Sequence, residues 1–134
     1  MKKNKLNTMK QIITKDENTC ILYEYKITKF EKLMKNKGKT INTNYSSVFP
    51  RELSEHIDVH ERTIFFYKQN NTIYITSRMP SIEHQQIKIQ KTNQFSIPKS
   101  YFPDVEKHTH IRICLNLDQK DTYSNKNKIT IHMI

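Results

Sequence analysis

Short runs in which apolar and polar residues alternate recur along this chain, and they predict a protein built mainly from β-strands. Within residues 20–28 every second position is apolar, and these positions are Ile21, Tyr23, Tyr25 and Ile27. A period of two is typical of a strand with one buried face. Residues 11–14 predict an earlier strand, and the polar residues 15–18 predict the turn that joins the two strands.

A short helix is predicted after these strands. Thr28 followed by Glu31 forms a capping-box pattern. The apolar residues that would then share one helical face are Phe30, Leu33 and Met34. Gly38, the only glycine of the chain, stands where such a helix would end.

The rest of the chain repeats one order of elements. Residues 39–51, moved by 48 positions, fall on residues 87–99, so that Ile41 meets Ile89. At the same shift, the step Phe49-Pro50-Arg51 meets Ile97-Pro98-Lys99. The strand 63–67 then meets 111–115. After eight further residues in the second copy, 73–75 meets 129–131. This order predicts two copies of one small unit.

Local signals in each copy fit this order. A proline is suited to the first position of a helix, so Pro50 and Pro98 predict one or two helical turns, with Pro103 ending the second helix. Residues 69–71 predict a hairpin turn, and residues 118–127 predict a longer, flexible polar loop between the last two strands.

The segment Gln94-Phe95-Ser96-Ile97-Pro98-Lys99-Ser100-Tyr101 resembles the signature of the AbrB/MazE/MraZ superfamily of swapped-hairpin proteins. The resemblance implies a mainly β fold with short helices, in which residues 37–79 and 85–134 are two repeats that interleave into one closed β-barrel. Residues 1–36 would precede them as a basic N-terminal extension made of a β-hairpin and a short helix. It also implies DNA contacts from the strand and turn before each proline, and assembly into a homodimer or larger homo-oligomer.

This chain departs from the family pattern at one place that matters for binding. The family commonly has a Gly-Arg pair in the turn before the Ile-Pro step. Here Asn93-Gln94 and Tyr45-Ser46 occupy those positions.

The net charge of the chain is +10, and it is concentrated at the N-terminal end. Residues 1–40 hold 11 lysines and 4 acidic residues, which gives +7. Such an excess attracts polyanions, either nucleic acid or an anionic membrane surface. No apolar run approaches the ~20 residues of a membrane span, and the start lacks the apolar core of a signal peptide. A cytoplasmic protein is therefore expected.

Basic and amide side chains around the two proline steps are the candidate nucleic-acid contacts. Lysine attracts phosphate, and asparagine or glutamine can pair with adenine in the major groove. The candidates of the first copy are Lys37, Lys39, Asn42, Asn44 and Arg51. Those of the second copy are Lys88, Gln90, Lys91, Asn93 and Lys99. The alternative for each is an ordinary solvated strand face or an ion pair.

No pattern in the sequence indicates an enzyme, a cofactor site or a metal site. Cys20 and Cys114 lie in apolar strand-like runs, where thiols are usually inert. One glycine in the chain excludes a phosphate loop. His108 and His110 lack further ligands at a zinc spacing.

The sequence thus predicts a transcriptional regulator that binds double-stranded DNA with sequence selectivity. Two alternatives remain open at this point. One is a protein-interaction module on the same fold, either antitoxin-like or an inhibitor of a host factor. The other is an RNA or single-strand binder that uses its aromatic residues.

Overall fold

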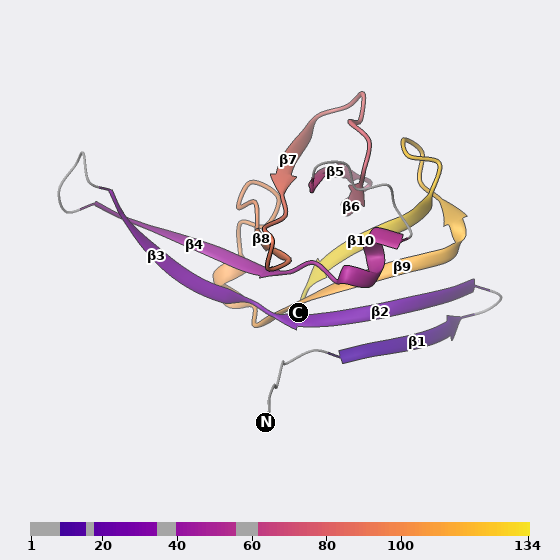
Figure 1. Ribbon diagram of the computed structural model, residues 1–134, viewed down its shortest axis with the longest axis horizontal. Coiled ribbons are helices and arrows are strands. Elements are labelled where there is room, and N and C mark those ends of the chain that lie inside the picture. Colours follow the sequence, from indigo (N-terminus) through magenta and orange to yellow (C-terminus); the bar gives the residue numbers. More distant parts are fainter. Residues whose placement is uncertain (1–8, 16–17, 35–39, 56–61) are drawn as a thin grey trace.

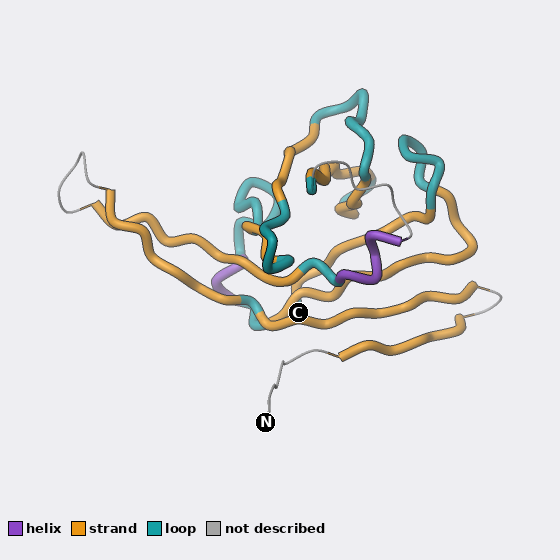
Figure 2. The backbone as a smooth tube through the Cα atoms, in the orientation of Figure 1, coloured by secondary structure: helices purple, strands orange, loops and turns teal. Residues whose placement is uncertain are grey.

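Strands account for most of the chain in the computed structural model (Figures 1 and 2). The structure describes the backbone of residues 9–15, 18–34, 40–55 and 62–134, and the side chains of 20–30, 43–53 and 62–134. Within these ranges there are ten strands and two short 3-10 helices. The prediction of a mainly β fold with short helices is therefore confirmed. None of the helices in these ranges is long and apolar enough to cross a membrane.

The strands form two sheets. The larger sheet has seven strands in the order β1-β2-β9-β10-β6-β5-β7, and the smaller has the order β3-β4-β8. In chain order the elements are β1 Met9–Lys15, β2 Asn18–Lys26, β3 Thr28–Met34, β4 Thr40–Val48, η2 Arg51–Glu55, β5 Thr63–Gln69, β6 Thr72–Thr76, β7 His84–Lys88, β8 Gln94–Ser96, η3 Val105–Lys107, β9 His110–Lys120 and β10 Asn127–Met133. All the pairings are antiparallel.

The N-terminal hairpin forms as its alternating pattern predicts. β1 pairs with β2 from Met9–Glu24 to Lys15–Asn18. The other edge of β2 pairs with β9, so β2 lies inside the large sheet. Tyr23 is only 1% exposed because it points into the core, and Ile21 packs partly against the same core.

The predicted helix after this hairpin is wrong, because residues 28–34 form strand β3. β3 pairs along its whole length with β4, from Thr28–Ser46 to Met34–Thr40. Pairing with β4 satisfies the backbone groups along one edge of this segment, whereas a helix of two turns has little stability of its own. The predicted helix end at Gly38 lies outside the described residues.

The hairpin β5–β6 confirms the turn predicted at residues 69–71. Asn70 and Asn71 have φ angles of 53° and 63°. Two successive left-handed residues are the geometry of a two-residue type I′ turn, which matches the twist of the strands, and asparagine tolerates that region well.

The hydrophobic core lies between the two sheets. β9 contributes Ile111, Ile113 and Leu115, all with no exposed surface. Phe95 of the small sheet meets Phe66 of the large sheet, with ring centroids 5.9 Å apart. The proline steps add to this core. Leu53 of η2 is fully buried, and after Pro98 the chain makes a single turn.

The loop between the last two strands is shorter than predicted and is organised around a buried carboxylate. β9 continues to Lys120, so the loop comprises only residues 121–126. Asp121 is 2% exposed and accepts hydrogen bonds from the Tyr67 hydroxyl (2.6 Å), the Thr76 hydroxyl (2.7 Å) and the Ser124 N–H (2.8 Å). Burial raises the pKa of Tyr67, and the bond to Asp121 raises it further, so Tyr67 stays a proton donor.

The sheets are open and do not form the single closed barrel that the family resemblance implies. β2 follows β9 as far as the pair Lys26–His110, and the chain then passes at Ile27 into β3 of the other sheet. The two sheets therefore meet at a corner, where one strand leaves one ladder and enters the next.

Candidate nucleic-acid interface

Strands β3 and β4 form a two-stranded ribbon that extends well beyond the rest of the molecule (Figure 1). β8 pairs with only the last three residues of β4, Ser46, Ser47 and Val48. From Asn44 outward, the described residues of β4 therefore pair with β3 alone. The seven paired positions make the described ribbon ~20 Å long at about 3.4 Å per residue.

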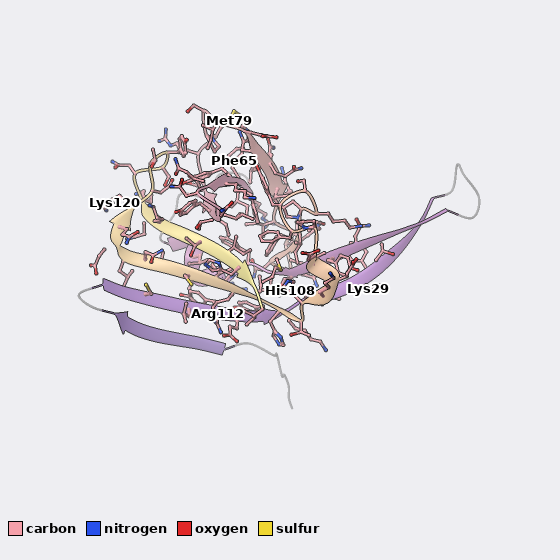
Figure 3. All side chains as sticks on the ribbon, turned by 180° about the vertical axis from the view of Figure 1, so that it is seen from behind. Lys29, Phe65, Met79, His108, Arg112 and Lys120 are labelled. Atoms are coloured by element: carbon pink, nitrogen blue, oxygen red, sulfur yellow. The ribbon has the colours of Figure 1, made fainter. Side chains whose placement is uncertain are left out.

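The ribbon segment carries much of the charge of the chain. Residues 28–44 comprise β3, part of β4 and the connection between them, and they contain five lysines, Lys29, Lys32, Lys35, Lys37 and Lys39, and a single acidic residue, Glu31. Five minus one gives +4 of the net charge of +10. Within the described strands, Lys29 is exposed and lies where the ribbon leaves the body (Figure 3). A segment with this charge attracts phosphate.

Two candidates from the first proline step, Asn42 and Asn44, belong to this ribbon. Asn44 is half-buried and stands opposite Phe30 in the ladder, and Asn42 stands opposite Lys32. Lys37 and Lys39 lie outside the described residues. Arg51 is exposed but begins η2, beyond the body end of β4, so it does not belong to the ribbon.

Lys99, the candidate that follows Pro98, lies at the base of the ribbon. Its ammonium group donates a hydrogen bond to the carbonyl oxygen of Thr43. The same group lies 5.8 Å from the ring centroid of Tyr45, a distance at which a cation attracts the ring face. The Ile97 N–H also donates to the Tyr45 carbonyl oxygen at 2.8 Å. Lys99 therefore braces the ribbon, a role that the sequence did not indicate.

The candidates that precede Pro98 belong to β7 and to the turn that follows it. The Asn93 N–H donates to the Gln90 carbonyl oxygen at 2.9 Å, and Asn93 has a φ of 69°. Gln90 shares a hollow with Thr28 and Phe30 of β3. Lys88, at the end of β7, and Lys91, in the turn, are both exposed. The structure thus brings Gln90 and Lys99 to the ribbon base.

Two ribbon residues were missed by the sequence reasoning, namely Lys29 and Phe30. The helix predicted between Thr28 and Gly38 concealed them, because it gave this segment no partner strand. The signal that could have revealed them is the accumulation of lysines on both sides of Gly38, a pattern that suits two antiparallel strands joined by a turn.

A second hollow, of about 450 Å³, lies on the outer face of the large sheet. Its two cationic residues are already engaged. Arg112 bonds to Glu24 at 2.6 Å, and the Lys128 ammonium lies 5.2 Å from the ring centroid of Tyr74. Burial raises the pKa of the Cys114 thiol in the same hollow, which keeps it protonated and a poor nucleophile. This hollow is a weaker candidate than the ribbon.

The histidines do not assemble a metal site in the described part of the chain. No three of its histidine, cysteine, aspartate or glutamate side chains are placed to hold an ion together. His110 lies 2.8 Å from the Thr109 hydroxyl through Nδ1, whereas His108 lines a different hollow with His132.

Comparison with known proteins leaves the ribbon as the main indication of function. No protein-family model, no curated protein and no solved structure matches the chain. The functional interpretation therefore rests on the geometry and charge of the molecule itself.

Proposed function

We propose that this protein binds double-stranded DNA through the ribbon β3–β4. The observation that carries the proposal is the coincidence of shape and charge. The segment that forms the two projecting strands and the connection between them, residues 28–44, also holds +4 of the net charge of +10. Lysines on a narrow, protruding support can reach phosphates without a clash between the body and the duplex.

The dimensions of the ribbon suit a DNA groove. A two-stranded β-ribbon fits the major groove of B-DNA, which is about 12 Å wide. Lysines such as Lys29 would then meet the phosphates, and the amides of Asn42 and Asn44 could pair with adenine edges. The first contribution gives affinity, and the second gives the sequence selectivity that a transcriptional regulator needs.

The strand register favours the two-copy architecture that the sequence predicts. Ser47 of β4 stands opposite Phe95 of β8, and these residues are 48 positions apart. The Phe49 N–H donates to the Asn93 carbonyl oxygen (2.7 Å), while the Ile97 N–H donates to the Tyr45 carbonyl oxygen (2.8 Å). A shift of 48 positions takes Phe49 to Ile97 and Tyr45 to Asn93. It therefore converts each of these two hydrogen bonds into the other. This is the relation expected of two copies that pair across an approximate two-fold axis.

The second pairing between the copies has the same property. Tyr74 of β6 stands opposite Thr130 of β10, and these residues are 56 positions apart. The difference from 48 is the eight residues by which the second hairpin is longer. We infer that the chain is an internally duplicated swapped-hairpin protein. In this arrangement β2 pairs with β9 in the same way that β7 pairs with β5. In this arrangement the leading strand of the first copy lies within residues 1–36.

The experiment that tests DNA binding is a salt titration with a fluorescent duplex. If the ribbon neutralises four phosphates, affinity falls about 10²-fold between about 50 and about 200 mM salt, because bound counterions are released on binding. Fluorescence anisotropy gives the affinity at each salt concentration. An affinity that does not change with salt, or a duplex that does not bind at low salt, contradicts the proposal.

A further inference from the structure

A hollow of about 300 Å³ lies at the base of the ribbon, between the two copies. β3 contributes Thr28 and Phe30, β4 contributes Ser46, and the turn after β7 contributes Gln90. The remaining lining residues are Gln94, Phe95 and Ser96 of β8. The hollow is therefore built from segments that are distant in sequence and adjacent to the lysine-bearing ribbon.

The chemistry of this hollow differs from that of the ribbon. None of its seven lining residues is charged. It offers three hydroxyls and two carboxamides, together with two phenylalanine rings, of which Phe30 is 40% exposed and Phe95 is 1% exposed. A phosphate needs positive charge, so this lining does not suit one. A planar, uncharged group with hydrogen-bonding edges suits it better.

The polar side chains of the hollow are available to a ligand. Gln94 accepts a long hydrogen bond of 3.4 Å from the Thr92 hydroxyl through its carbonyl oxygen. The side chains of Thr28, Ser46, Gln90 and Ser96 make no hydrogen bond to any residue that the structure describes. A carboxamide presents a donor beside an acceptor, which is the arrangement that pairs with the edge of a nucleobase.

We propose that this hollow receives one unpaired nucleobase of the DNA that the ribbon holds. The base would lie against the exposed ring of Phe30 and present its edge to Gln90, while the lysines of the ribbon retain the phosphates on either side. Proteins that take a base out of a duplex use this combination of stacking and side-chain hydrogen bonds. This inference rests on the proposed DNA binding and adds to it a preference for a distorted or unpaired site.

The test uses the full chain and three labelled duplexes that differ at one position. The first is fully paired, the second carries one extra unpaired adenosine, and the third carries an extra abasic nucleotide there. The abasic duplex has the flexibility and the phosphate of the bulge but lacks the base. We expect the adenosine bulge to bind ~10-fold more tightly than the other two duplexes, as stacking of one base on one aromatic ring allows.

Two variants locate this preference in the hollow. In Phe30→Ala and in Gln90→Ala, the affinity for the adenosine bulge should come close to the affinity of the same variant for the paired duplex. The matched controls Leu117→Ala and Gln86→Ala replace exposed residues outside the hollow, and they should keep the preference.

The outcomes separate this inference from the proposed function. Equal binding of the adenosine and abasic bulges overturns the base pocket while leaving DNA binding intact. A preference that survives in both pocket variants also overturns it. Failure of all three duplexes to bind overturns the proposed function and the pocket together.

Discussion

Replacement of Asp121 by alanine is expected to lower the free energy of unfolding by about 3–5 kcal/mol, the range found when a buried polar network loses its central member. Asp121 is 2% exposed and joins Tyr67 of β5, Thr76 of β6 and the backbone of the loop 121–126. Alanine leaves two hydroxyls and one N–H without their acceptor. The measurement is urea unfolding, followed by circular dichroism in the far ultraviolet.

The controls separate the network from the general effect of removing a carboxylate. Asp104→Ala removes an exposed aspartate that makes no capping bond to η3, and it should change stability by less than about 0.5 kcal/mol. Asp121→Asn keeps the size and one acceptor oxygen, so its loss should be intermediate. Equal stability of the Asp121→Ala and Asp104→Ala proteins would show that the network contributes nothing.

The same carboxylate predicts how stability changes with pH. Burial alone would raise the pKa of Asp121, but the hydrogen bonds from Tyr67, Thr76 and Ser124 outweigh burial and lower it. A group with a lowered pKa in the folded state contributes its full stability above the unfolded pKa of about 3.9, and loses it as the pH falls through the folded pKa. The wild-type protein should therefore lose more stability on acidification than the Asp121→Asn protein.

The second large effect is expected from removal of charge from residues 28–44, which comprise the ribbon strands up to Asn44 and the connection between them. The triple variant Lys29→Gln, Lys35→Gln and Lys37→Gln should bind duplex DNA about 10²- to 10³-fold more weakly near 0.1 M salt. The slope of its affinity against salt concentration, on logarithmic scales, should also be shallower by about 0.9 for each phosphate that is no longer neutralised, or about 3 for three phosphates. Fluorescence anisotropy over a series of salt concentrations measures both quantities.

A matched control variant has the same net charge as this triple variant but retains Lys29, Lys35 and Lys37. Lys68→Gln, Lys107→Gln and Lys120→Gln replace three exposed lysines of the body, and Lys120 lies at the far end of the molecule from Lys29 (Figure 3). Both triple variants lower the net charge from +10 to +7. Only the ribbon variant should lose most of its affinity. Equal losses in both would mean that overall charge, and not the ribbon, attracts the DNA.

The sequence by itself determined the features that depend on neighbouring residues. The alternation in residues 20–28 placed Tyr23 in the core because a strand turns successive side chains to opposite faces. Asn70 and Asn71 specified a tight turn because asparagine tolerates the left-handed region that this turn requires.

Only the tertiary structure decided what depends on a distant partner. Residues 28–34 have a pattern that a helix or a strand could satisfy, and pairing with β4 made them a strand. Asp121 looks like an ordinary loop residue until Tyr67 and Thr76 surround it. The hollow at the ribbon base joins Phe30 to Gln90 across some sixty positions. No local pattern encodes such contacts, because they depend on the packing of the whole chain.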